Sequence, residues 1–265
     1  MADALLPRST PTAQGIDPAA IIALIDAAEA GGHGLHSLMI VRHGSVVAEG
    51  WWHPYAAPVR HTAFSISKSF LSTAIGMAQA EGLLSIDEPV IDFFPEVGSG
   101  PRDVTLRHLL MMASGHEADT MSIMRALPSE DWPRLYFDVP FVHPPGTFFT
   151  YDSGGSYLLS VALTRRTGQS PREFLEQRLF RPLGRETPPW AISPTGFDLG
   201  GSGTRLLTED IALLSELYRR GGVGHWSNLT WPSGRQFVAS PQPPRRLLGV
   251  SPQPPPRRRS PAPRR

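Results

Sequence analysis

The sequence predicts an α+β fold, in which an N-terminal antiparallel hairpin precedes a larger, mostly helical body. Two observations lead to this prediction. Residues 35–52 contain two apolar runs around a tight-turn signal, which is typical of a hairpin. Between residues 65 and 224, helical periodicity recurs in segments that begin at capping residues and end at glycines. The 265 residues are 40% hydrophobic and 18% charged, as expected of a soluble globular chain.

The N-terminal elements are predicted from their boundary residues. A helix over residues 16–32 is capped by Asp17, continues with a proline in its first turn and stops at a pair of glycines. The hairpin that follows turns at Gly44. The next helix begins at Ser65 and ends by Gly82.

Four further helices complete the predicted body. The first covers residues 105–115 and stops at Gly115. The second follows a proline-glycine turn and ends at Gly168, and the third opens with a Ser-Pro pair and closes at Gly184. The last helix is capped by Thr208, with two acidic residues in its first turn.

Composition changes abruptly after about Gly224, so we predict a folded domain over residues 1–224 and a disordered Pro/Arg-rich tail over residues 225–265. Residues 241–265 carry seven arginines, nine prolines and no acidic residue. Such a segment cannot bury enough apolar surface to offset its ordering entropy. We favour the interpretation that the tail is an unselected or out-of-frame end. The alternative is a functional tail, which either contacts nucleic acid through its arginines or serves as a proline-motif ligand.

Several classes of protein are excluded by the composition. No apolar run approaches the roughly 20 residues that span a bilayer, so we expect no membrane partner. The N-terminus lacks the regions of a signal peptide, so we expect a cytoplasmic protein, unless a misassigned start hides an export signal. There is no cysteine, the nine histidines are scattered, and no P-loop or dinucleotide fingerprint occurs. We therefore predict neither a metal nor a cofactor.

Lys68 is the only lysine in the sequence, and the other 24 of its 25 Lys and Arg residues are arginines. A guanidinium stays charged, whereas a desolvated lysine amine can accept a proton. Ser65 lies three residues earlier, so its hydroxyl and the amine would share one helix face. Unpaired N–H groups in the first turn would stabilise an alkoxide, and we expect Phe64 and Phe70 to desolvate the pair. The pattern predicts either an activated serine nucleophile or an ordinary exposed helix turn.

A nucleophilic serine also needs a group that passes a proton to the leaving group. Tyr151 is the best candidate, because it lies in a loop anchored by a Pro-Gly turn and its phenol can donate or accept a hydrogen bond. Ser153 places a second hydroxyl two residues further on. The alternative is a half-buried tyrosine whose hydroxyl merely finds a partner.

Around these residues the sequence resembles the serine β-lactamase-related family, which includes class C β-lactamases, penicillin-binding DD-peptidases, esterases and 6-aminohexanoate-dimer hydrolases. The similarity covers roughly residues 15–224. It is carried, in the family's order, by residues 64–96, 103–117, 144–184 and 194–223. The resemblance implies a β-lactamase/DD-peptidase-like fold.

The resemblance also implies roles for four residues. Ser65 would be the acylated nucleophile, Lys68 its base partner and Tyr151 the tyrosine of the family's second motif. That motif is often Tyr-x-Asn, and here Ser153 stands where the asparagine amide often helps to hold substrate. This difference points to the esterase or amide-hydrolase branch rather than to an efficient β-lactamase.

The family's third motif, a strand of the Lys-Thr-Gly or His-x-Gly type, has no match between residues 225 and 265. In the family this strand belongs to the same sheet as the hairpin and supplies one oxyanion-hole N–H. The resemblance therefore implies a member that is C-terminally truncated or altered, with the C-terminal strands of the sheet missing. Loss of one oxyanion donor commonly lowers the rate by about 10²–10³.

We thus predict a serine hydrolase that forms and hydrolyses an acyl-Ser65 intermediate on a small ester or amide. Lys68 and Tyr151 would transfer protons, and Ser153 would bind substrate. A nucleic acid would be a partner only through the Arg-rich tail. The alternative is a catalytically impaired, truncated relative that holds an acyl or peptide ligand without turnover.

Overall fold

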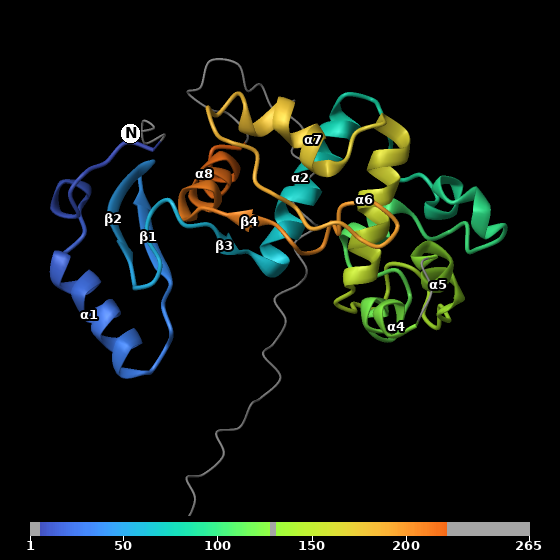
Figure 1. Cartoon of the computed structure of the whole chain (residues 1–265), viewed down its shortest axis with the longest axis horizontal. Helices are drawn as coiled ribbons and strands as arrows, with labels where there is room; N and C mark the ends of the chain where they lie inside the picture. The colour runs from blue at the N-terminus through green and yellow to red at the C-terminus, as the bar shows by residue number, and fades with distance from the viewer. Residues whose placement is uncertain (1–5, 128–130, 222–265) are drawn as a thin grey trace, which may run out of the picture. The chain divides into compact units, whose positions relative to one another are not determined.

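A computed structural model describes residues 6–127 and 131–221, all of which belong to one structural unit (Figure 1). The tail predicted for residues 225–265 lies outside the described residues. Within them, a two-stranded hairpin precedes a body in which helices predominate. The predicted α+β fold is confirmed.

The first helix begins where the sequence predicts it. α1 (Pro18–Ala30) follows a short 3₁₀ turn, η1 (Thr12–Gln14). The side chain of Asp17 accepts a hydrogen bond of 2.9 Å from the backbone N–H of Ala19. This bond satisfies one of the N–H groups that a helix start leaves without an intrahelical partner.

The hairpin consists of β1 (Ser37–Arg42) and β2 (Ser45–Trp51), paired antiparallel. Its two turn residues, His43 and Gly44, both have positive φ, at 50° and 79°. Two-residue hairpin turns need this conformation because it matches the twist of the flanking strands. The predicted turn at Gly44 is therefore confirmed.

One face of the hairpin packs against α8 (Thr208–Arg219) (Figure 1). Leu213 of this helix forms a fully buried apolar cluster with Leu6 and Val46. Apolar side chains of alternate β1 residues complete the cluster, because successive residues of a strand point to opposite faces. The C-terminal helix of the described residues thus covers the N-terminal strands.

The start of α8 differs from the prediction. Leu207, not Thr208, is the N-cap, and its backbone N–H donates to the carboxylate of Asp210 at 2.9 Å. Thr208 instead donates its hydroxyl to Ser37 Oγ in β1, at 2.8 Å. Thr208 therefore links the helix to the hairpin, an interaction between distant segments that a local capping pattern does not reveal.

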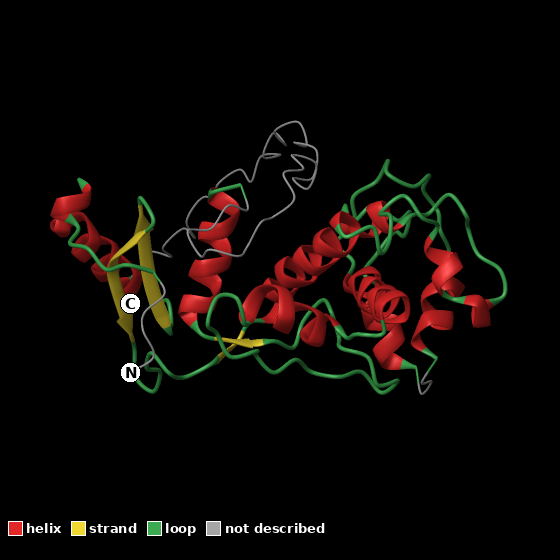
Figure 2. Ribbon diagram, turned by 90° about the horizontal axis from the view of Figure 1, so that it is seen from above, coloured by secondary structure: helices red, strands yellow, loops and turns green. Residues whose placement is uncertain are grey.

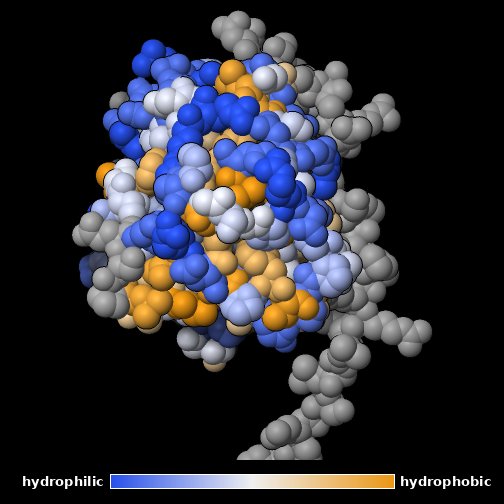
Figure 3. Space-filling view, turned by 90° about the vertical axis from the view of Figure 1, so that its right-hand side faces the viewer, coloured by the Kyte–Doolittle hydropathy of each residue, from blue (hydrophilic) through white to orange (hydrophobic). Residues whose placement is uncertain are grey.

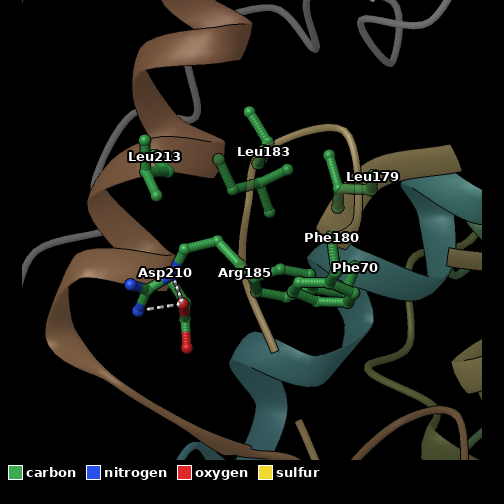
Figure 4. A pocket seen from close by; sticks show the side chains of 8 residues that line it. Phe70, Leu179, Phe180, Leu183, Arg185, Asp210 and Leu213 are labelled. Carbon is green, nitrogen blue, oxygen red and sulfur yellow. Dashed lines mark hydrogen bonds and ion pairs between the residues drawn. The ribbon is translucent and has the colours of Figure 1, made fainter. Parts of the chain in front are cut away.

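The carboxylate of Asp210 lies in a pocket at the base of α8 (Figure 4). It accepts a hydrogen bond of 2.8 Å from Arg185 and is 1% exposed. Phe70 stacks on Phe180 in the same pocket, with the ring centroids 5.8 Å apart, and leucine side chains close it (Figure 4). Charge pairing and apolar packing together fix α8 against the helical body.

A second pair of strands lies apart from the hairpin. β3 (His61–Thr62) pairs antiparallel with β4 (Arg205–Leu206), and each has two residues (Figure 2). The pairing joins the segment just before the predicted nucleophile to the segment just before α8.

The helical body is organised around α6 (Ser153–Thr167), in which residues 154–163 are all buried. α2 (Ser67–Ala80) packs beside α6 (Figure 1). The remaining elements are η2 (Phe64–Ile66), η3 (Val90–Phe93), η4 (Pro95–Val97), α3 (Leu106–Leu110), α4 (Thr120–Ala126), α5 (Trp132–Asp138), α7 (Pro171–Leu175) and the short π-helix η5 (Glu176–Phe180).

Viewed from the right-hand side of Figure 1, the surface is largely hydrophilic, with apolar residues in scattered patches (Figure 3). No helix of the described part is both long and apolar enough to cross a membrane.

A predicted helix end is correct where the glycine directly follows the last residue of the helix. α6 ends at Gly168, which is left-handed with φ 70°. α3, by contrast, ends at Leu110 rather than at Gly115. The chain leaves this helix at Met112, which has φ 54°, and the next N–H bonds back to a helix carbonyl. A methionine in this conformation is uncommon, so the sequence pattern placed the end too late.

Candidate functional site

Ser65 lies in η2, the 3₁₀ turn that leads directly into α2. The prediction of a helix that begins at Ser65 is therefore corrected, since α2 begins at Ser67. Residues three apart eclipse one another in 3₁₀ geometry, so Lys68 still lies on the same side as Ser65. The Lys68 Nζ to Ser65 Oγ distance is 3.2 Å.

Two buried hydroxyl groups, those of Ser67 and Thr204, hold the turn that carries Ser65. Ser67 Oγ donates to the Phe64 carbonyl at 2.6 Å and lies 2.7 Å from Thr204 Oγ1. The carbonyl of Thr204 also accepts the N–H of Ala63 at 2.9 Å. The residues on both sides of Ser65 are thus fixed to the segment that precedes β4.

Neither phenylalanine desolvates the site as predicted. Phe64 is 71% exposed, whereas Phe70 is 1% exposed and packs on Phe180 in the core. For Phe64 the reason is its backbone, whose φ of 42° turns the chain sharply just before Ser65. Helical periodicity assumes a regular backbone and cannot foresee this turn.

Lys68 is the centre of the contacts around Ser65. Its Nζ donates to Ser153 Oγ at 3.2 Å and to the Gly201 carbonyl at 2.8 Å, besides contacting Ser65. The same nitrogen lies 4.8 Å from the centroid of the Tyr151 ring. In the part of the chain that the structure describes, no carboxylate pairs with Lys68. The amine therefore faces hydroxyl groups and a carbonyl rather than a counter-ion.

Tyr151 lies in the loop before α6 and is 45% exposed. Burial alone would raise the pKa of its phenol, but contacts with the Ser65 hydroxyl and the Lys68 ammonium outweigh this effect. The pKa of Tyr151 is consequently below its ordinary value. A more acidic phenol gives up its proton more readily, which suits a proton donor.

The structure therefore brings together all four residues singled out in the sequence. Ser65, Lys68 and Ser153 are linked through the lysine amine, and Tyr151 contacts both members of the Ser-x-x-Lys pair. The four residues come from η2, α2, the loop before α6 and the first position of α6. Two segments about 85 residues apart along the chain thus meet at one point.

A glycine-rich loop over residues 200–203 also contacts the site. A Cβ added at Gly201 would lie 3.1 Å from Lys68 Nζ and 3.0 Å from Ser156 Cβ. Gly200 has φ 66°, and a Cβ there would lie 2.7 Å from the Ser156 carbonyl oxygen. Only glycine lets this loop approach both α2 and α6 closely enough for its carbonyl to reach the lysine.

Sequence reasoning missed three residues that bear on this geometry: Gly201, Asp119 and Asp152. Three of residues 200–203 are glycines, but nothing in the local sequence indicates that one of their carbonyls accepts from Lys68. Asp152 does carry a local signal, because an aspartate directly before a predicted helix start is a typical N-cap. Asp119 has the same signal at the start of α4.

An open cleft of about 450 Å³ lies next to Ser65. It is lined by residues from the start of β1, from β3 and η2, and from α8: His36, Ser37, His61, Thr62, Ala63, Phe64, Ser65, Ile66, Thr208 and Ile211. None of these is an aspartate, glutamate, lysine or arginine. The cleft thus offers hydroxyl, imidazole and apolar groups to whatever lies beside Ser65.

In residues 6–127 and 131–221, no group of three or more His, Cys, Asp or Glu side chains could hold a metal ion. The contacts around Ser65 instead consist of hydroxyl groups, one amine and one backbone carbonyl.

Comparison with known proteins places this geometry in context. A family model described as Beta-lactamase matches residues 23–208, which is more than half of the chain. The match includes all four residues of the candidate site.

Three relatives illustrate the similarity. The 6-aminohexanoate-dimer hydrolase of Paenarthrobacter ureafaciens is 23% identical over 205 residues, which cover 71% of this chain and 52% of that protein. A Bacillus anthracis structure assigned as a 6-aminohexanoate-dimer hydrolase superposes with a TM-score of 0.68 at 18% identity, covering 78% of this chain and 59% of the other. The structure of a D-stereospecific amidohydrolase from Streptomyces sp. superposes with a TM-score of 0.58 at 20% identity, covering 77% of this chain and 74% of the other.

At these levels of identity the structural similarities establish the fold. They confirm the predicted β-lactamase/DD-peptidase-like architecture. The chain spans about half the length of the curated relatives it matches.

Proposed function

Because the chain belongs to the beta-lactamase family, we propose that it is a serine hydrolase that cleaves a small ester or amide through an acyl-Ser65 intermediate. One observation above all supports the proposal: the only lysine amine of the chain lies 3.2 Å from Ser65 Oγ and has no carboxylate partner among the described residues. An amine in this position can take the proton of the hydroxyl group that it contacts.

In the proposed acylation step, Ser65 Oγ attacks the substrate carbonyl carbon while its proton passes to Lys68 Nζ. The carbonyl oxygen becomes an oxyanion, which the backbone N–H of Ser65 would stabilise at the first turn before α2. When the oxyanion collapses, the bond to the leaving alcohol or amine breaks. The leaving group takes its proton from Tyr151, whose lowered pKa favours this transfer.

Lys68 then returns its extra proton to the Tyr151 phenolate, so the site regains its starting protonation. Deacylation repeats the steps with water as the nucleophile. Water adds to the acyl carbon as one of its protons passes to Lys68 Nζ, and when the bond to Ser65 Oγ breaks, this oxygen takes the proton back from Lys68 Nζ. Ser65 is regenerated and a carboxylic acid is released.

The geometry also supports a role for Ser153 in substrate binding. Its hydroxyl accepts from Lys68 and stands at the first position of α6, where it can hydrogen-bond a substrate next to Ser65. A serine here forms fewer hydrogen bonds than an asparagine amide, which favours small esters or amides over β-lactams. The proposed reaction includes no metal, cofactor, membrane or nucleic acid. A cytoplasmic location stays a prediction from the sequence.

Hydrolysis of p-nitrophenyl butyrate by the purified chain tests the proposal. We expect release of p-nitrophenolate that Ser65→Ala reduces to the buffer rate. Ser69→Ala is the matched control, because Ser69 is exposed on the next turn of α2, and it should retain the wild-type rate.

Equal rates for the wild type and Ser65→Ala, with both proteins folded by circular dichroism, would overturn the proposal. That result would favour the alternative of a binding protein that keeps the pocket without turnover. Binding of the ester to both proteins, measured by calorimetry, would then support this alternative.

A further inference from the structure

Two aspartates connect the start of α4 with the start of α6, next to the candidate site. Asp119 is the N-cap of α4, and its Oδ1 accepts the N–H of Met121 at 3.0 Å. The same oxygen accepts the N–H of Ser153 at 2.8 Å. One carboxylate oxygen therefore caps its own helix and also holds the first residue of the other helix.

The second aspartate makes the reciprocal connection. Asp152 is the N-cap of α6, and its Oδ1 accepts the N–H of Gly154 at 3.0 Å. The same oxygen accepts the N–H and the hydroxyl of Thr120, at 3.0 and 2.7 Å. Asp152 is 3% exposed, so these bonds are formed in the interior. The side chains of Thr120 and Met124 pack so closely on Gly154 that a Cβ would clash there.

We propose that Asp119 and Asp152 are positioning residues, which hold Ser153 and Tyr151 against the amine of Lys68. The proposal rests on the serine hydrolase function argued above. Tyr151 directly precedes Asp152, and Ser153 directly follows it. The carboxylate pair thus fixes the backbone directly after Tyr151, at the start of α6, through the N–H groups of Ser153 and Gly154.

The contacts of Ser153 distinguish this arrangement from ordinary capping. An N-cap aspartate usually serves one helix, as Asp17 does at the start of α1. Ser153, however, is held through its backbone N–H by Asp119 while its Oγ accepts from Lys68 Nζ. Loss of the Asp119 bond would let the Ser153 hydroxyl move relative to the lysine. Small displacements of catalytic groups, of about 1 Å, can lower rates by about 10²-fold.

Asp119→Ser separates positioning from folding. Serine is a good N-cap, so α4 keeps its cap, but the side chain is one atom shorter and loses the bond to Ser153. Asp119→Asn retains an oxygen that can accept both bonds and serves as the rescue variant. Asp17→Ser makes the same change at a cap remote from the site and serves as the matched control.

The first measurement uses the fact that Lys68 is the only lysine of the chain. Reductive ¹³C-methylation of the full chain then labels one lysine side chain, whose NMR signal is told apart from that of the terminal amine by its absence from Lys68→Arg. We expect Asp119→Ser to shift this signal in the direction that Ser153→Ala shifts it. Asp119→Asn and Asp17→Ser should leave it in place.

The second measurement is hydrolysis of p-nitrophenyl butyrate. We expect Asp119→Ser to lower kcat by about 10-fold or more, Asp119→Asn to restore it to within about twofold, and Asp17→Ser to leave it unchanged. An unshifted Lys68 signal with wild-type kcat in Asp119→Ser would overturn the positioning role. If the wild type shows no Ser65-dependent turnover, the proposed function fails, and the Lys68 signal by itself still decides whether Asp119 positions Ser153.

Discussion

Lys68→Arg is expected to lower the rate of ester hydrolysis by about 10³-fold or more while the chain stays folded. The substitution keeps the positive charge, so the rate would be unchanged if Lys68 contributed only its charge. A guanidinium, however, cannot accept the proton of Ser65 at any pH at which the protein is stable. Single substitutions in comparable nucleophile–base units lower kcat by about 10⁴–10⁶-fold.

The matched control is Arg102→Lys, the reverse exchange at an exposed ion pair with Asp92. It should leave the rate of p-nitrophenolate release unchanged. A Lys68→Arg rate within tenfold of wild type would contradict the assignment of Lys68 as the base, since only its charge would then matter. Circular dichroism of both variants shows whether the fold is retained.

Asp152 is expected to make the folded protein less stable as the pH rises from 4 to 7. Burial raises its pKa to about 6, although hydrogen bonds from Thr120 oppose the shift, and Asp119 adds a further increase. The phenol of Tyr136, itself fully buried, also lies beside the carboxyl. Between the ordinary value of 3.8 and about 6, the folded state holds a proton that the unfolded state has lost. Stability therefore falls with rising pH, by roughly 2 kcal/mol between pH 4 and 7.

Asp152→Asn isolates this contribution. An asparagine keeps the oxygen that accepts from Thr120 and Gly154 but does not titrate. Urea unfolding of both proteins at pH 4, 5.5 and 7 should show that the variant gains stability relative to wild type as the pH rises. Glu216, whose pKa is about 2 and whose partners Arg219 and Arg220 lie away from Asp152, contributes equally in both proteins and cancels in the difference. A difference that is constant across this pH range would show that Asp152 is charged throughout.

The local part of the site could be predicted from the sequence, because a spacing of three residues across the turn from η2 into α2 determines it. Ser65 and Lys68 meet across one helical turn, so no tertiary contact is needed to bring them together. The cap at Asp17 and the stop at Gly168 depend likewise on single residues. The loop and the phenol of Tyr151 indicate a proton-transfer group, although its neighbours alone leave a structural role open. The resemblance to the family's second motif favours the first interpretation.

The remaining features depend on contacts between distant segments. The Gly201 carbonyl accepts from a lysine 133 residues away, and Asp119 holds a serine 34 residues away. No periodicity or spacing specifies such pairs. The expected desolvation by Phe64 was wrong for a different reason, since a positive φ at a phenylalanine breaks the regular backbone on which the prediction relied.

Detection of the acyl-enzyme tests the central claim most directly. The chain is mixed with p-nitrophenyl butyrate, quenched in acid within seconds and digested with trypsin, which releases residues 61–68 as one peptide, HTAFSISK. We predict that this peptide gains one butyryl group on Ser65, because the hydroxyl of Ser67, the other serine, is buried and hydrogen-bonded. Release of p-nitrophenolate without acylation of this peptide, or acylation only elsewhere in the chain, would contradict the account.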